Sequence, residues 1–244
     1  MRSAISVIVF TLILIASMFP ADEPKQAGWS GNITIGASVV TGNADTSTFT
    51  VAFKADKTFK QPFEWLNSGS FLTSSAEGGK TAEKIVLSSR LNWTFTPRFH
   101  MFGELQGMRD RFKDYRYQYV PALGIGYKFI NTKKIQLSAH GGVALRIIKY
   151  YRSGNKEDDL ALKLGNRFTW AFSKTAELKQ SLEWIPEFSD LGDYFLLAEL
   201  SLAASLGGHW AISITINETY DSAPVSPDVE KSDTTFTAGI TKKF

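Results

Sequence analysis

Side chains able to carry out chemistry are sparse in this sequence of 244 residues. It contains no cysteine and only three histidines, His100, His140 and His209, and none of these stands at metal-ligand spacing from another histidine or a carboxylate. Serines are plentiful, but none lies in a G-x-S-x-G context, which would place a nucleophile on a sharp turn. The sequence therefore predicts no metal site, no cofactor and no enzyme.

A second group of side chains that could act on solutes is charged, and these residues recur at alternate positions of apolar stretches. Most of them are cations, and those we expect to line a lumen are Arg90, Arg146, Lys163, Arg167, Lys128 and Glu199. On the wall of an open barrel they would filter solutes electrostatically and favour anions. In a closed barrel the same residues would form a satisfied plug of salt bridges, and the sequence leaves both interpretations open.

Two acidic segments, residues 155–159 and 221–233, fall between the predicted strands. Their carboxylates could gather Ca²⁺ or Mg²⁺ between lipopolysaccharide phosphates, but neither segment has the spacing of a dedicated calcium loop. We favour the interpretation that both are solvated loops.

The elements that must position these charges follow a period of two. In residues 32–40 isoleucine, alanine and valine alternate with asparagine, threonine, glycine and serine, which predicts a strand with one apolar and one polar face. Eight clear segments of this kind and four weaker ones give about twelve strands, with ten or fourteen as alternatives. The weaker segments start near Glu64, Phe99, Ala176 and Tyr194.

The composition of the two faces indicates what each face meets. The apolar face carries many large aromatics, whereas the polar face is rich in Gly, Ser, Thr and Asn with isolated charges. This distribution is typical of a barrel with lipid outside and polar groups inside. Because hydrocarbon cannot satisfy unpaired backbone groups, the sheet must close. We therefore expect residues 28–244 to form an all-β, antiparallel, up-and-down transmembrane β-barrel.

The start of the chain predicts export. A basic Met1-Arg2-Ser3 precedes an apolar run from Ala4 to Met18, so residues 1–21 are expected to be a secretory signal peptide. An uncleaved inner-membrane anchor is the alternative.

Aromatic residues and the last residue supply an independent test. Tryptophans are predicted at the periplasmic ends of the strands, and tyrosines near the outer ends, as in the aromatic belts of membrane proteins. These residues are Trp29, Trp65, Trp93, Trp170 and Trp210 at one rim, and Tyr115, Tyr117, Tyr150, Tyr151, Tyr194 and Tyr220 at the other. Phe244 ends an alternating strand and is similar to the assembly signal of outer-membrane barrels. Lys242 departs from that signal, because an apolar residue usually occupies its place.

Three stretches carry a family resemblance. They are the hairpin Thr41–Asp45, residues 109–112 together with 123–128, and residues 217–244 with a proline-containing loop, Asp233 and a closing strand. Over roughly residues 28–244 the chain resembles the family of salt-induced outer membrane proteins, known as domain of unknown function 481 (DUF481). The resemblance implies an outer-membrane location and carries no catalytic residue over to this sequence.

These observations predict an outer-membrane protein of a Gram-negative bacterium. The expected partners are outer-membrane lipid, lipopolysaccharide and the barrel assembly machinery, and a net charge of +3 is too small to imply nucleic acid. The first expected function is a narrow, anion-leaning pore for small solutes. The alternatives are a non-conducting structural or adhesive envelope barrel acting through its outer loops, and a soluble periplasmic lipid-binding barrel. The oligomeric state is left open.

Overall fold

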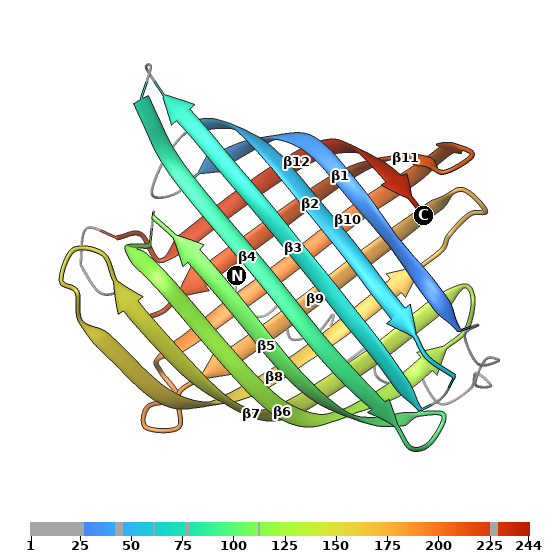
Figure 1. Cartoon of the computed structure of the whole chain (residues 1–244), viewed down its shortest axis with the longest axis horizontal. Helices are drawn as coiled ribbons and strands as arrows, with labels where there is room; N and C mark the ends of the chain where they lie inside the picture. The colour runs from blue at the N-terminus through green and yellow to red at the C-terminus, as the bar shows by residue number, and fades with distance from the viewer. Residues whose placement is uncertain (1–26, 42–45, 61, 77–78, 112, 225–228) are drawn as a thin grey trace, which may run out of the picture.

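The structure, a computed structural model, describes residues 27–41, 46–60, 62–76, 79–111, 113–224 and 229–244. These residues form twelve strands that pair in sequence order and close through β1 and β12 (Figure 1). The strands are β1 (Gly28–Thr41), β2 (Thr46–Thr58), β3 (Phe63–Ala76), β4 (Gly79–Thr94), β5 (Phe99–Asp110), β6 (Tyr115–Asn131), β7 (Ile135–Tyr150), β8 (Lys156–Trp170), β9 (Ala176–Pro186), β10 (Tyr194–Gly207), β11 (Trp210–Asp221) and β12 (Ser232–Lys243).

Each strand runs antiparallel to both of its neighbours, so the barrel has two distinct ends. We call the end that holds the start of β1 and the end of β12 the termini end. The opposite end, which we call the loop end, carries among others the links between β5 and β6 and between β11 and β12.

The predicted fold class is confirmed: the sheet is an all-β, antiparallel, closed barrel of twelve strands rather than ten or fourteen. The four weak segments are strands β3, β5, β9 and β10, and each begins within one residue of its predicted start. The predicted signal peptide, residues 1–21, and the hairpin tip at residues 42–45 lie outside the described residues. The signal peptide therefore stays a prediction.

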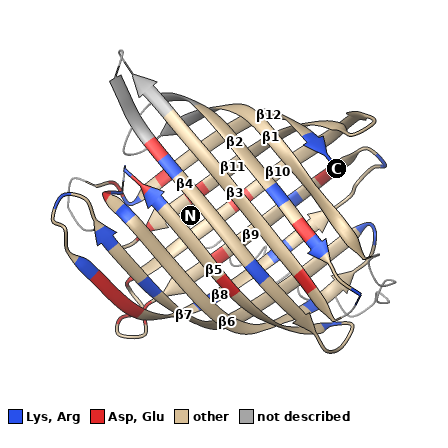
Figure 2. Cartoon of the chain, viewed as in Figure 1, with Lys and Arg blue, Asp and Glu red and all other residues tan. Residues whose placement is uncertain are grey.

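Alternate side chains face outward and inward as the period of two predicts. On β8, Leu164 is 39% exposed on the outer surface, whereas its neighbour Lys163 is 0% exposed inside the barrel. On β11 three isoleucines, at positions 212, 214 and 216, all lie exposed on the outside. An apolar surface this extensive is covered by lipid rather than water. Charges are correspondingly few along the strands (Figure 2).

Tryptophans gather at the termini end as predicted. All five of the predicted rim tryptophans are exposed there, and the rings of Trp29 and Trp65 lie 6.2 Å apart. The Nζ atom of Lys242 lies 5.4 Å from the centre of the Trp210 ring, so the lysine that departs from the assembly signal lies over an aromatic face. The backbone of Phe244 exchanges two hydrogen bonds of 3.0 Å with Gly31 and thereby extends the seam between β1 and β12.

The tyrosine rim needs a correction. Tyr115 and Tyr150 are at the loop end as predicted, but both are buried inside the barrel. The pairing of β6 with β7 shifts between Tyr115 and Tyr117, and this β-bulge reverses the side on which Tyr115 projects. Tyr150 occupies an inward position of β7, opposite Tyr115. The prediction was wrong about these two residues because it treated rim position as evidence of an outward direction.

Among the described residues, no helix is long and apolar enough to cross a membrane, and this finding concerns helical spans only.

Glycines on the inner face let the large inner side chains lie flat against the wall. Gly124 pairs with Phe102 on one side and Gly142 on the other. A Cβ atom at Gly142 would come within 2.2 Å of the backbone oxygen of Leu123, which cannot move without shifting β6. Only glycine therefore fits at this close approach.

We predict that Gly142→Ala destabilises the barrel by about 1–3 kcal/mol, since overpacking against backbone forces the strands apart. The matched control is Gly107→Ala, where the nearest atom to an added Cβ is a side-chain carbon of Tyr119 at 3.5 Å. Denaturant unfolding of both variants in lipid vesicles measures the difference. Equal stability of the two variants would contradict the close approach.

Candidate functional site

The interior of the barrel is not evenly filled. The inner faces of β4–β9, which we call the filled wall, carry long and charged side chains that are largely buried. The inner faces of β10, β11, β12, β1, β2 and β3, which we call the open wall, carry mainly Ser, Thr, Ala and Gly. The space inside the barrel is therefore displaced toward the open wall.

Four charges of the filled wall form what we call the central network: Arg90, Glu104, Lys163 and Glu183. The Nζ atom of Lys163 lies 3.1 Å from Glu104 Oε1 and 3.1 Å from Glu183 Oε2. Arg90 Nη1 lies 3.4 Å from Glu104 Oε2. The side chains of Arg90, Glu104 and Lys163 are almost completely removed from solvent. Charges buried in this way persist only when they are paired, so each member depends on the others.

A second cluster lies nearer the loop end. Arg146 donates to Glu187 and lies 3.6 Å from Asp193 Oδ1, and its guanidinium sits 5.5 Å from the centre of the Phe195 ring. Burial raises the pKa of the Asp193 carboxyl, and the neighbouring Arg146 opposes that shift by favouring the charged form. Three strands are tied together here, because Arg146 belongs to β7, Glu187 follows β9 and Asp193 precedes β10.

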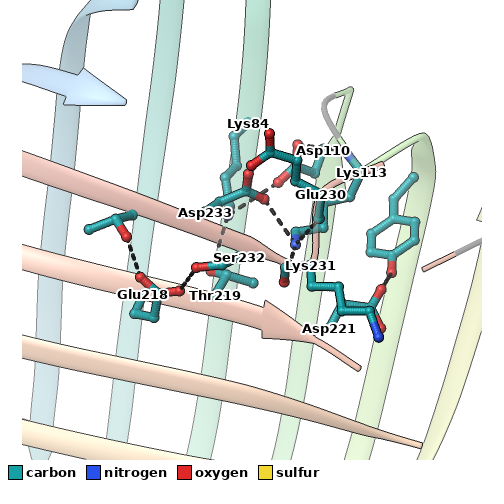
Figure 3. Close-up of polar contacts among 12 residues, drawn as sticks. Lys84, Asp110, Lys113, Glu218, Thr219, Asp221, Glu230, Lys231, Ser232 and Asp233 are labelled. Atoms are coloured by element: carbon teal, nitrogen blue, oxygen red, sulfur yellow. Dashed lines mark hydrogen bonds and ion pairs between the residues drawn. The ribbon is translucent and has the colours of Figure 1, made fainter. Parts of the chain in front are cut away.

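The loop end is crossed by a buried lysine, as Figure 3 shows. Lys113, in the link between β5 and β6, places its Nζ atom 3.0 Å from Asp233 Oδ2 on β12. The same nitrogen donates to the backbone oxygens of Lys231 at 3.1 Å and Glu230 at 3.3 Å. We call this set of contacts the Lys113 bridge. The Lys113 side chain is 0% exposed, because residues from both sides of the mouth surround it.

Local geometry explains how Lys113 is turned inward. The next residue, Asp114, adopts a positive φ of 62°, which aspartate tolerates better than most residues. Its carboxylate accepts a 3.1 Å hydrogen bond from the backbone nitrogen of Arg152 in the following loop.

Two further contacts span the same mouth (Figure 3). Lys84 on β4 lies 3.1 Å from Asp110 Oδ2 and donates to Thr219 on β11 at 3.4 Å. The hydroxyl of Tyr115 donates to Asp221 Oδ2 at 2.6 Å. Strands β4–β6 are thus connected to β11 and β12 across the loop end of the barrel.

The open wall is different in character. Hydroxyl groups pair along it, with Thr34 and Thr241 2.7 Å apart and Ser201 and Thr215 2.9 Å apart. One charge pair reaches into the space: Lys54 Nζ on β2 lies 3.7 Å from Glu199 Oε1 on β10, and these side chains are 47% and 36% exposed. Solvent therefore reaches the middle of the open wall, which it does not do at the central network.

A cavity of about 100 Å³ lies in the termini-end half of the barrel, against the inner faces of β3 to β8. We call it the termini-end cavity. It is lined by Glu64, Leu66, Arg90, Asn92, His100, Lys128, Ser138, Ala139, His140 and Arg167.

The structure places all six predicted lumen residues on inward positions, in three different settings. Arg90, Arg146 and Lys163 are buried in ion pairs. Lys128 and Arg167 line the termini-end cavity, and Glu199 faces Lys54 across the open wall. Arg167 also lies 3.9 Å from Glu183, and Glu199 lies 3.7 Å from Lys54, so the salt-bridge interpretation describes the first three residues and, with longer distances, these two. A role of the six residues in selectivity stays a prediction.

Sequence reasoning missed the Lys113 bridge. Lys113 lies in a link with no alternation, and nothing in its neighbourhood indicates a partner more than a hundred positions away. Asp233 was noted only as part of a family resemblance. Among the described residues no group of three or more His, Asp or Glu side chains is placed to hold a metal ion.

Comparisons with known proteins agree with this architecture. The family described as "Protein of unknown function, DUF481" matches residues 33–244. The uncharacterized protein YdiY of Escherichia coli (strain K12) is 24% identical over 217 residues, which are 87% of this chain and 82% of that protein.

Two solved structures share the fold at low sequence identity. The NanC porin has a TM-score of 0.58 at 10% identity and covers 87% of this chain and 100% of its own. The translocator domain of autotransporter NalP from Neisseria meningitidis has a TM-score of 0.54 at 12% identity and covers 100% of this chain and 97% of its own. Both likenesses concern the barrel alone.

We predict that Lys163→Met destabilises the barrel by about 3–5 kcal/mol, because it removes the cation between two buried carboxylates and leaves each with a single, more distant arginine. Lys54→Met is the matched control and should cost at most about 1 kcal/mol, since its pair is reached by solvent. Unfolding in lipid vesicles gives both values. The account fails for the central network if the two variants are equally stable, or if Lys163→Met with Glu183→Gln recovers none of the loss.

Proposed function

Because the chain belongs to the DUF481 family, whose description names no activity, we propose its function from geometry: an outer-membrane barrel that forms a narrow, anion-leaning pore for small solutes. The observation that carries this proposal is the uneven interior. Ion pairs and large side chains fill one wall, whereas the other wall presents small hydroxyl side chains and a solvent-reached charge pair. A polar surface of this kind is suited to passing small hydrated solutes.

Charge selectivity in this pore comes from the cations that solvent can reach. A buried cation whose field is cancelled by a carboxylate about 3 Å away contributes little to a passing ion. Lys54 and Arg167 have side chains that are 47% and 42% exposed and therefore attract anions. Glu199, 3.7 Å from Lys54, and Glu183, 3.9 Å from Arg167, oppose them. We therefore expect a modest preference for anions rather than a strict filter.

The Lys113 bridge limits passage at the loop end. With Lys84 and Tyr115 it connects opposite sides of the mouth, so solutes pass when these contacts open. The pore is consequently expected to conduct rarely in its resting state.

Location and partners follow from the outer surface. The exposed apolar belt and its tryptophan rim support insertion in a bilayer, with outer-membrane lipid and lipopolysaccharide as neighbours. The signal peptide at residues 1–21 would deliver the chain, and the barrel assembly machinery would read Phe244. Passage involves no chemical step, so we propose neither an enzyme nor a cofactor.

A second candidate function is a structural or adhesive envelope barrel that acts through its outer loops. The contacts that cross the loop end are the observation that favours it. A soluble lipid-binding barrel would need an apolar interior, whereas ion pairs and hydroxyl groups line most of the interior here and its buried apolar clusters are small, so we do not propose it.

The experiment that tests the pore is conductance across a planar bilayer. Lys113→Met removes the bridging cation and should raise the time-averaged conductance several-fold over the unsubstituted barrel. Lys231→Met is the matched control, because the Lys231 side chain contacts only the neighbouring backbone oxygen of Ser222 among the described residues.

The second measurement is the reversal potential in a chloride gradient, which gives the charge selectivity of the pore. Lys54→Gln combined with Arg167→Gln should reduce the preference for chloride over potassium. If correctly folded Lys113→Met protein is as silent as the unsubstituted barrel, the pore proposal fails and the envelope barrel is supported.

A further inference from the structure

We propose that the termini-end cavity is a binding site for a small oxyanion, a solute that carries a phosphate or carboxylate group. Three cationic side chains from three strands line it: Arg90 from β4, Lys128 from β6 and Arg167 from β8. Glu64 is the one carboxylate in its lining. Arg90 also lies 3.4 Å from Glu104, and Arg167 lies 3.9 Å from Glu183, so part of their charge is already neutralised. When these two carboxylates and Lys163 between them are counted, four cations face three carboxylates. The remaining positive charge and the guanidinium groups suit oxygen anions, to which arginine donates in a fixed planar geometry.

Arg90 is held in place before any ligand arrives. Its Nε atom donates to Asn92 Oδ1 at 3.0 Å, and its guanidinium lies 3.7 Å from the centre of the Phe102 ring. Asn92 in turn donates to Glu64 Oε2 at 3.3 Å, so the carboxylate that lines the cavity already has a hydrogen-bond partner. A cation fixed in this way loses little conformational freedom on binding.

His100 provides an independent observation that points to a ligand. It is 6% exposed, lines the cavity and has a buried Nδ1 atom without a hydrogen-bond partner among the described residues. The His100 ring lies against Gly126, where an added Cβ would come within 2.3 Å of the imidazole. Only the absence of a side chain at Gly126 leaves space for the ring. A buried polar atom without a partner is costly. In the tautomer that carries its hydrogen on Nδ1, the neutral His100 ring would donate a hydrogen bond to an anion oxygen.

The size of the cavity restricts the class of ligand. About 100 Å³ is well below the volume of pockets that bind drug-sized ligands, so the cavity holds a small ion rather than a chain or a lipid. Arg167 is 42% exposed, so solvent reaches this part of the wall, and binding does not require the Lys113 bridge to open. The site thus goes beyond the proposed function, because an anion can be held whether or not it crosses the barrel.

Calorimetric titration of the refolded barrel in detergent, at constant ionic strength set with chloride, tests the site. The probes are inorganic phosphate and succinate, with glycerol as the uncharged comparison. We expect saturable binding of at least one of the two anions and none of glycerol. The stronger of the two anions identifies the group that the site prefers.

Variants then locate the binding. Arg167→Gln should weaken it about tenfold or more, because a charge-assisted hydrogen bond is lost. Lys133→Gln, at an exposed turn of the termini end, removes the same charge outside the cavity and should leave binding unchanged. His100→Phe keeps a ring against Gly126 but removes both nitrogens, and it should also weaken binding. Mobility in unboiled and boiled gel samples verifies that each variant is folded.

The site is overturned if neither anion binds saturably, or if Lys133→Gln weakens binding as much as Arg167→Gln does. Conductance of the same preparations separates this result from the pore. A barrel that conducts but binds no anion defeats the site alone, whereas one that binds an anion and never conducts defeats the pore alone.

Discussion

Because hydrocarbon surrounds the closed sheet, the charged residues of the strands are stable mainly on its inner face. Outward positions in the middle of the strands are mostly apolar, and outward polar residues there hydrogen-bond to one another, as Ser89 does with Asn67 and Asn166 with Gln180. Most charged residues in the middle of the twelve strands therefore share a single narrow interior. There they are removed from water and must neutralise one another. The placement of Lys163 between Glu104 and Glu183 is the clearest result of this constraint. The packing of the filled wall follows from it.

The uneven filling of the interior links the fold to function. Because large and charged side chains come from β4–β9, the remaining strands line the free space with small hydroxyl groups. The Lys113 bridge crosses that space at the loop end, and the termini-end cavity lies toward the opposite end. One arrangement of side chains therefore accounts for the hydroxyl-lined open wall, the contacts across the loop end and the basic cavity.

The sequence predicted most of the fold because a period of two determines which face each strand residue occupies. It could not predict Tyr115, since a β-bulge changes the direction of a side chain without changing the pattern around it. It placed Arg90, Arg146 and Lys163 inside but could not assign their partners, because alternation specifies a face and not a neighbour across the lumen. The Lys113 bridge joins the link between β5 and β6 to the start of β12 and the link before it, and the lysine itself lies where no periodicity exists.

The most direct test of the account is a cysteine accessibility scan, which the absence of native cysteine makes clean. Single cysteines at Thr215 on the open wall, Ala122 on the filled wall and Ile214 on the outer surface would be exposed to thiol reagents in lipid vesicles. The account predicts that a polar reagent modifies only the Thr215 position, and that a lipid-soluble reagent modifies the Ile214 position. Equal modification of positions 215 and 122 by the polar reagent, or its reaction at position 214, would contradict it.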